Sequence, residues 1–327
     1  MKPNLSVNIG KLKLKNPVMV ASGTFGYAEE FKDFINLKKL GAIVTKTITL
    51  KPRPGNLPPR TCETPAGLLN SIGLENPGIE GFIEDKLPFL KKIGVPLIVS
   101  ISSEKNLDEF VTLAGQLDKI KEISAIELNI SCPNIRLVGE SVSQLASLNT
   151  GKPANQLTGK LIVQDANVTY DLVKKVRKIT KKTLITKLSP NVTDIAEIAQ
   201  AAERAGTDAV SLINTVTAMC IDVETIKPKL GTITGGLSGP AIRPIALKMV
   251  WEAYNKIKIP IIGMGGIMDT LSALEFFIAG ATAISIGTAN FINPRVSVEV
   301  VSGLKEYLKR KKIKNINELI GSLNYEN

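Results

Sequence analysis

Short apolar runs recur along the chain, and each is followed by a polar or glycine-containing segment and then by helical spacing of apolar residues. Runs that are apolar on both faces are typical of parallel strands buried under helices, and their alternation with helices predicts an α/β fold. The eight predicted strands are Val18–Ser22, Ala42–Thr47, Pro96–Ser102, Ala125–Ser131, Thr183–Leu188, Ala209–Thr215, Ile259–Gly265 and Ala283–Thr288. The spacing predicts helices over Leu107–Ile123, Val168–Thr180, Asp194–Ala205, Ile242–Lys256, Thr270–Ala279 and Pro294–Arg310.

Eight such units favour a closed (β/α)8 TIM barrel. Ala205-Gly206 and Ala279-Gly280 close two helices before the next strand, as short αβ connections require. A doubly wound open sheet is the alternative, but no G-x-G-x-x-G follows the first strand, where Ser22–Gly26 is only a glycine-containing loop. Because neither a linker nor a repeat interrupts the pattern, we expect one domain over residues 1–327.

Two long stretches lack any periodicity. Residues 50–81 follow the second strand and residues 135–166 follow the fourth. Loops beyond about 12–15 residues in a compact domain are usually functional or disordered. Both follow the carboxyl ends of strands, where barrel enzymes keep their active sites, so we expect lids over a pocket.

Composition narrows the class of protein. The chain is 44% apolar and 22% charged, as in an ordinary globular protein, and no apolar run is long enough to cross a bilayer. Met1–Lys15 alternates lysine with apolar residues, so we expect no signal peptide and, by default, a cytoplasmic location. The net charge of +11 comes without a nucleic-acid motif, and we interpret it as solvated faces that also attract small anions.

The absence of histidine constrains the chemistry, because proton transfer must then use Cys, Lys, Asp, Glu or Tyr. The three cysteines, Cys62, Cys132 and Cys220, are widely spaced and form no C-x-x-C pair. That spacing argues against a disulfide framework, a zinc site or an iron–sulfur cluster held by this chain alone, so no metal site is expected. For Cys62 and Cys220 we expect buried, inert thiols.

Glycines gather after the last three predicted strands. They lie in Gly235-Gly-Leu-Ser-Gly239, Gly263-Met-Gly-Gly266 and Gly287-Thr288. Bare backbone N–H groups at helix starts bind anions, and the loops after barrel strands seven and eight are the usual phosphate site. Each glycine pair alone would fit a tight turn, but three at one face predict a phosphate-binding cradle.

The fourth strand ends in Asn129-Ile-Ser-Cys-Pro-Asn134, which sets Cys132 at the barrel mouth as a candidate base or nucleophile. Amides recur at the same rim in Asn70, Asn129, Asn134 and Asn214, with Thr215 beside the last. Converging amides suit a planar imide-like ring such as a pyrimidine. Two lysines inside apolar strands, Lys46 and Lys187, would be costly unless they meet an anion.

Seven segments together resemble class 1 dihydroorotate dehydrogenases, and more narrowly the catalytic subunit of the NAD-linked class 1B enzymes. They span most of the chain in matching order: 47–50 with 58–63, Gly67–Gly78, Asn129–Asn134, Lys187–Asp194, Ile213–Thr215, Gly235–Pro240 and Ile261–Gly266. The resemblance implies that Cys132 removes a proton from C5 of dihydroorotate while hydride passes from C6 to FMN. The protein would then supply orientation and electrostatics around the flavin.

The resemblance also implies site residues. FMN would be bound by Ser22, Lys46, Thr47, Ser100, Asn129, Lys187, Ile213, Gly239, Gly265, Gly266, Gly287 and Thr288. The substrate would be bound by Lys46, Asn70, Ser71, Ile72, Gly73, Leu74, Asn129, Asn134, Asn214 and Thr215.

Two departures from the family pattern matter. Ser100 stands where the family usually has an amide at the end of strand three, so it keeps a hydroxyl but loses reach toward the flavin. The loop after Cys132 carries a polar insertion within about Arg136–Gln164, and only Gly139 remains of a glycine-rich flap.

The class 1B enzymes that this chain resembles have two kinds of subunit. The second subunit carries FAD and an iron–sulfur cluster and passes electrons to NAD. The resemblance therefore implies a heterotetramer of two catalytic and two electron-transfer chains. Four alternatives stay open: a flavin barrel acting on another pyrimidine, one using another acceptor such as fumarate, a redox-free lyase or isomerase with the same phosphate cradle, and a non-catalytic flavin-binding protein. Pyrimidine-reducing relatives typically carry His where Asn134 stands, which favours orotate.

Overall fold

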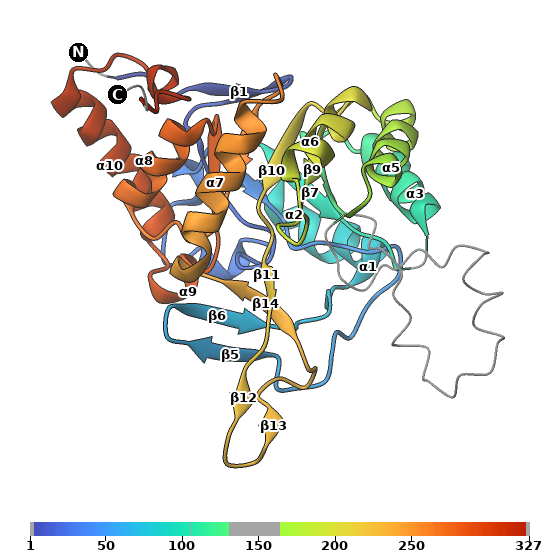
Figure 1. Cartoon of the computed structure of the whole chain (residues 1–327). Helices are drawn as coiled ribbons and strands as arrows, with labels where there is room; N and C mark the ends of the chain where they lie inside the picture. The colour runs from blue at the N-terminus through green and yellow to red at the C-terminus, as the bar shows by residue number, and fades with distance from the viewer. Residues whose placement is uncertain (1–2, 105, 131–163, 325–327) are drawn as a thin grey trace.

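The computed structural model describes residues 3–104, 106–130 and 164–324, and its central feature is a closed barrel of eight strands (Figure 1). Every barrel strand pairs in parallel with its two neighbours, in chain order around the ring. The strands are β3 (Val18–Val20), β4 (Ala42–Val44), β7 (Leu97–Ile101), β8 (Ala125–Asn129), β9 (Thr183–Lys187), β10 (Ala209–Leu212), β15 (Ile261–Gly263) and β16 (Ala283–Ile286). All eight lie within the predicted strands, so the TIM-barrel prediction is confirmed.

Helices cover the outside of the barrel. Six match predicted helices: α3 (Leu107–Asp118), α5 (Ala166–Ile179), α6 (Ile195–Arg204), α7 (Arg243–Tyr254), α8 (Thr270–Ala279) and α10 (Val296–Lys311). In α3 the buried side chains are Phe110, Leu113, Ala114 and Leu117, the spacing that puts one face of a helix against a sheet. Because the strands are buried on both faces, the core is one continuous apolar cluster between the ring of strands and these helices.

Shorter elements complete the ring. The β3–β4 connection contains only the 3-10 turns η1 (Glu29–Phe31) and η2 (Leu37–Lys39). Before β7 the chain forms α1 (Gly78–Gly81), a π-helical turn η3 (Phe82–Lys86) and α2 (Leu87–Leu90), and α9 (Ala289–Ile292) follows β16. The hairpin of β1 (Val7–Ile9) and β2 (Leu12–Leu14) precedes the barrel, and η7 (Ile316–Leu319) follows α10.

A second sheet lies over the carboxyl ends of the barrel strands, below the barrel in Figure 1. Its strand order is β11 (Val216–Ala218), β14 (Gly235–Ser238), β6 (Gly67–Asn70) and β5 (Thr61–Thr64). The expectation that residues 50–81 form a loop without secondary structure is therefore wrong in part, because β5 and β6 lie within it. A small hairpin of β12 (Ile221–Asp222) and β13 (Lys227–Pro228) projects from this sheet (Figure 1).

The other long loop, residues 135–166, lies almost wholly outside the described residues. Only its end is described, where Asp165 accepts hydrogen bonds from the N–H groups of Asn167 and Val168 and begins α5. Over the described ranges, no helix combines the length and the apolar character that a membrane span needs.

The start of α8 offers a test of local stability. Asp269 accepts hydrogen bonds from the Ser272 N–H (2.8 Å) and hydroxyl (2.7 Å), which hold the pKa of Asp269 below its usual range. We expect Asp269→Ala to lower the free energy of unfolding by about 1 kcal/mol at neutral pH, since it removes an N-cap. Because a lowered pKa stabilises the fold only above the unfolded value, the difference from the parent should shrink as pH falls below about 4. Chemical denaturation at several pH values measures this difference. Asp269→Asn keeps a cap without the charge, so the difference in free energy of unfolding between Asp269→Asn and Asp269→Ala should change little with pH.

Candidate active site

A chain of hydrogen-bonded polar side chains crosses the barrel mouth. The Asn129 amide nitrogen donates to the Thr47 hydroxyl at 3.1 Å, and that hydroxyl pairs with the Ser100 hydroxyl at 2.9 Å. On the other side, the Asn214 amide nitrogen lies 3.4 Å from the Asn129 side-chain oxygen. The Asn214 oxygen in turn accepts from the Thr215 N–H at 2.8 Å. Residues from β7, β8 and the ends of β4 and β10 thus meet, as parallel strands ending at one rim require.

Ser100 is fully buried, and its hydroxyl is occupied by Thr47. The Ser100 backbone N–H also donates to the Thr45 hydroxyl at 3.4 Å, and its shorter reach toward a flavin stays a prediction.

Lys187 ends β9 beside Asn129 of β8 and Ser211 of β10. It is only 5% exposed, and among the described residues no carboxylate forms an ion pair with it. A nearly buried ammonium without a carboxylate is stable only if another anion or polar group meets it. Lys187 therefore has the setting that an anionic ligand would need. Lys46 follows β4 and is half-buried. Its backbone N–H donates to Gly26 O at 2.8 Å, which fixes the position of the residue.

The segment Asn70–Leu74 follows β6 and is held from its outer side. Asn56 donates from its side chain to Ser71 O (2.9 Å) and from its backbone to Ile72 O (3.0 Å). The next two carbonyls, of Gly73 and Leu74, accept from the side chains of Arg53 and Asn76. The Ser71 hydroxyl is buried and has no partner within the described residues, so it is available to a ligand.

This segment meets the polar chain through β14. The Asn70 amide donates to Gly236 O at 3.1 Å, and a Cβ on Gly236 would lie 2.1 Å from the Thr215 hydroxyl. Such an approach is possible only without a side chain at Gly236. Asn70, Thr215, Asn214 and Asn129, all expected to bind substrate, thus form one cluster.

The glycine segments converge beside it. Gly239, Gly265 and Gly266 all have positive φ (93°, 126° and 75°), and a Cβ on Gly266 would lie 2.8 Å from Gly239 O. The Thr288 hydroxyl donates to the Ser238 hydroxyl at 2.7 Å, which joins the loop after β16 to β14. The structure thereby brings together the three arms of the expected anion cradle, and it adds Ser238, which the sequence pattern did not single out.

The remaining expected cofactor residues line the same rim. Ile213 packs against Gly265, since a Cβ there would lie 3.3 Å from Ile213 Cγ1, and a Cβ on Gly287 would lie 3.7 Å from Ala21, next to Ser22. The peptide between Leu212 and Ile213 is cis. Cys132 and Asn134 lie outside the described residues, which end at Ile130 just past β8 and resume at Gln164.

Comparison with known proteins identifies the family of this chain. The family model described as dihydroorotate dehydrogenase matches residues 4–150 and 135–308. The chain belongs to the dihydroorotate dehydrogenase family. Its relatives include proteins from Trichlorobacter lovleyi, 50% identical over 99% of both chains, and Caldicellulosiruptor bescii, 51% identical over 98% of this chain and 99% of the relative. Another, from Geotalea uraniireducens, is 48% identical over 98% and 99%. All three are named dihydroorotate dehydrogenase B (NAD(+)), catalytic subunit.

This member of the dihydroorotate dehydrogenase family also buries a carboxylate that sequence reasoning missed. Glu127 of β8 is 2% exposed, and its Oε2 accepts from the Ser211 hydroxyl at 3.0 Å, while Oε1 is buried without a partner in the described part of the chain. A charged residue inside the apolar run Ala125–Ile130 is the only signal the sequence holds for it. The bond joins β8 to β10 across the barrel interior. Glu127 precedes Asn129 by two residues on β8, so it lies deeper in the barrel than the paired residues Asn129 and Lys187.

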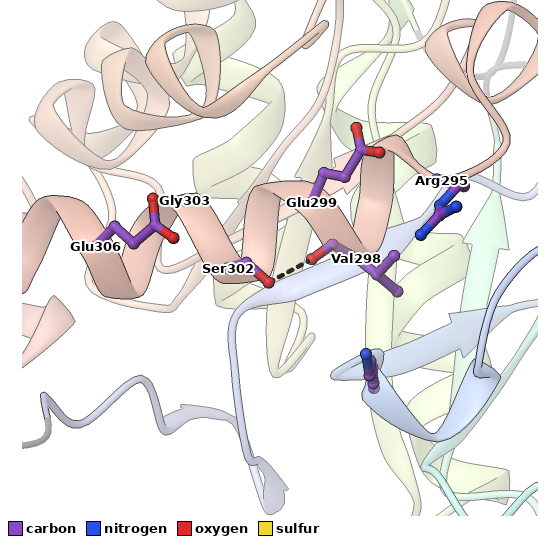
Figure 2. Close-up of a pocket in the computed structure, with 7 residues that line it drawn as sticks. Arg295, Val298, Glu299, Ser302, Gly303 and Glu306 are labelled. Carbon is purple, nitrogen blue, oxygen red and sulfur yellow. Dashed lines mark hydrogen bonds between the residues drawn. The ribbon is translucent and has the colours of Figure 1, made fainter.

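A groove elsewhere on the surface does not belong to this site. A groove of about 280 Å³ lies along α10 and is lined by Arg295, Glu299, Glu306 and their neighbours on that helix, together with Lys39. Figure 2 shows the lining side chains of α10. None of the expected site residues lines it. In the parts that the structure describes, no group of three or more acidic or cysteine side chains is placed to hold a metal ion.

The buried Glu127 generates a stability prediction for this dihydroorotate dehydrogenase family member. Ser211→Ala removes the hydroxyl that Glu127 Oε2 accepts from, and we expect it to lower the free energy of unfolding by about 1–3 kcal/mol. Ser285→Ala is a matched control, because the Ser285 hydroxyl is equally buried in β16 but has no partner among the described residues. Urea denaturation of both variants measures the difference. Equal losses would show that the Ser211–Glu127 bond contributes nothing.

Proposed function

We propose that this chain oxidises dihydroorotate to orotate in pyrimidine biosynthesis, as the catalytic subunit of an NAD-linked dihydroorotate dehydrogenase. The main support is that three glycine segments and a cluster of amides lie at one barrel mouth, in a chain that matches the family over nearly its whole length.

FMN is the proposed cofactor, and the chain has features that fit it. The positive-φ glycines Gly239, Gly265 and Gly266 pack closely against neighbouring atoms beside the start of η6 (Pro240–Ile242) and α7, and backbone N–H groups at helix starts can bind a phosphate. Lys187 offers a nearly buried positive charge without a carboxylate partner in the described chain. The residues that would hold FMN are Ser22, Lys46, Thr47, Ser100, Asn129, Lys187, Ile213, Gly239, Gly265, Gly266, Gly287 and Thr288. When bound, FMN supplies the acceptor for the hydride that leaves C6 of dihydroorotate.

The substrate ring is proposed to lie against the amide cluster. Its ligands would be Lys46, Asn70, Ser71, Ile72, Gly73, Leu74, Asn129, Asn134, Asn214 and Thr215. Amides donate and accept at once, which matches the alternating N–H and C=O groups of a dihydropyrimidine. The Ser71 hydroxyl, which has no partner among the described residues, and the charge of Lys46 are suited to its carboxylate. Because the carbonyls of residues 71–74 are held from outside, the segment keeps a fixed shape for binding.

Cys132 is the proposed base, which removes the proton at C5 of dihydroorotate. It follows β8 by three residues, just past Asn129, and a chain without histidine has few other groups for proton transfer. Asn129 and Lys187 orient the ring and hold the charge that develops when that proton leaves.

Electron transfer to NAD is proposed to need a partner. We propose a second subunit that carries FAD and an iron–sulfur cluster, in a heterotetramer of two plus two chains with a cytoplasmic location. The support is that the curated relatives are named catalytic subunits and that no dinucleotide fingerprint follows the first strand of this chain.

The deciding experiment is the visible spectrum of the purified chain before and after anaerobic addition of dihydroorotate. We expect a yellow protein that loses its flavin absorbance and passes no electrons to NAD on its own. A colourless protein would favour a lyase or isomerase, and a yellow protein that fails to bleach would favour a flavin-binding protein without this activity. Rapid NAD reduction by the chain alone would refute the need for a partner subunit. Faster oxidation of the reduced flavin by fumarate would instead make fumarate the electron acceptor.

Substitution of the proposed base gives a kinetic test. Cys132→Ala should retain FMN but slow flavin reduction by dihydroorotate by about 10²–10⁴-fold, the usual contribution of a positioned base. Cys132→Ser should keep a residual rate, because a hydroxyl is a poor base at neutral pH. Cys62→Ser is the matched control for loss of a thiol and should reduce its flavin at the parent rate in stopped-flow measurements. A Cys132→Ala enzyme as fast as the parent would assign the base to another group.

A further inference from the structure

Polar groups outside the candidate site differ in how deeply they lie. Cys62 and Cys220 are partly exposed, so the expectation that they are buried is wrong. Glu127 of β8 and Ser285 of β16, in contrast, are 2% and 1% exposed. Glu127 Oε1 and the Ser285 hydroxyl are both buried, and neither has a hydrogen-bond partner among the described residues. Because a buried polar atom without a partner loses its hydration and gains nothing in return, both atoms need a partner that the side chains around them do not supply.

The strand register places these two side chains at one height in the barrel. A step around the ring at constant height follows one strand pairing and then moves one residue along, because the strands are tilted and the shear of such a barrel equals its number of strands. Repeating this step from Glu127 passes through Thr186, Ser211, Gly263, Ser285, Val20, Val44 and Val99 and returns to Glu127. Because the circuit closes, these positions form one ring, with one member on each barrel strand.

Alternate members of this ring point into the barrel. Glu127 and Ser211 point inward, because their hydrogen bond of 3.0 Å joins β8 to β10 past the intervening strand β9. Gly263, the ring member on β15, points outward, since a Cβ there would lie 2.5 Å from Phe276 of the outer helix α8. The four inward side chains are therefore Glu127, Ser211, Ser285 and Val44, which make one layer of the barrel interior.

Glu127 and Ser285 face each other across the full width of the barrel, because β16 lies four strands from β8 in either direction. With strands about 4.8 Å apart and tilted by about 36°, opposite backbones are separated by about 15 Å. A glutamate and a serine side chain together are shorter than this width, so the two do not meet directly. Val44 is typical of barrel interiors, but Ser211 is much smaller than the branched residues that usually fill them. The layer therefore has room for a small molecule between Glu127 and Ser285.

We propose that this layer is an internal binding site for one water molecule, held between Glu127 Oε1 and the Ser285 hydroxyl. The water donates to the carboxylate oxygen and bonds to the Ser285 hydroxyl, so that both buried atoms gain a partner. Buried waters typically make about three hydrogen bonds to polar groups that otherwise lack one. The bond from the Ser211 hydroxyl to Glu127 Oε2 holds the carboxylate in position for this contact.

A water fits this layer better than a monovalent cation. Leu128 pairs with Thr186, and the next residue of β9 is Lys187, so this lysine belongs to the next layer toward the barrel mouth. Lys187 is only 5% exposed, so solvent screens its positive charge weakly. A cation beside Glu127 would be repelled by that charge, whereas a neutral molecule is not.

The water would link two sides of the barrel beneath the candidate site. β8 leads to Asn129, and β16 leads to Gly287 and Thr288. A bridge from Glu127 to Ser285 therefore joins the strand that carries the amide cluster to the strand that carries one of the glycine segments. This site does not depend on the proposed function, because it uses only side chains of the barrel interior.

A crystal structure of the full chain, at a resolution that shows ordered water, tests the proposal directly. We expect a density peak within hydrogen-bond distance of both Glu127 Oε1 and Ser285 Oγ. In crystals of Ser285→Gln, the longer amide should take the place of this peak and donate to Glu127 itself. The proposal is overturned by two ordered side chains with no peak between them, or by a Ser285 hydroxyl that turns to a backbone carbonyl. Anomalous signal at the peak after a rubidium soak would assign a cation and would also reject the water site.

Urea denaturation tests whether the water joins the two side chains. Ser285→Ala should lower the urea midpoint by less than Ser211→Ala does, because the water keeps its bond to Glu127. The matched control repeats Ser285→Ala in a Glu127→Met chain, where an apolar side chain of similar length replaces the carboxylate and the same change should leave the midpoint unaltered. Equal shifts in both backgrounds would show that no water joins Ser285 to Glu127. If the Glu127→Met chain does not fold, the crystal structure of the parent decides the question alone.

Discussion

The site depends on the buried amide of Asn129. Its nitrogen and oxygen link Thr47 on one side of the barrel mouth to Asn214 on the other, and its backbone oxygen accepts from Ser102 at 3.1 Å. An amide at this depth is stable only when its donor and acceptor are both used. The hydrogen bonds therefore fix the relative positions of β7, β8 and the ends of β4 and β10 at the rim, where the proposed ligand groups gather. Glu127, two residues earlier on the same strand, makes a similar link to β10 one layer below.

The barrel could be predicted from sequence because its strands are buried on both faces, so most contain a short apolar run such as Leu97–Val99. β5 and β6 escaped prediction because they are four residues long and mostly half-exposed, and they are stabilised by β14, which lies more than 160 residues further along the chain. That the three glycine segments lie at one face was predictable from their spacing alone. The pairing of Ser238 with Thr288, and of Glu127 with Ser211, was not, because a single polar residue in a sequence does not reveal a partner on a distant strand.

The second sheet couples parts of the chain that would otherwise be independent loops. β6 comes from the loop after β4, and β11 and β14 come from the loop after β10, yet Leu69 pairs with Leu237 and Leu237 with Val216. Leu69, in one of the two central strands of this sheet, is 1% exposed. The polar residues at the edge of the sheet thereby acquire the rigidity of strands, which is the condition for a site that binds a ring in one orientation.

β14 touches both halves of the site. Gly236, near its start, adjoins Asn70 and Thr215, and Gly239, just after its end, adjoins Gly266. With a rise of about 3.3 Å per residue, the two glycines are separated by about 10 Å of extended backbone. Ligands that bind at both ends of β14 at once must therefore span about 10 Å. The length of a ligand, as well as its chemistry, then decides whether it fits.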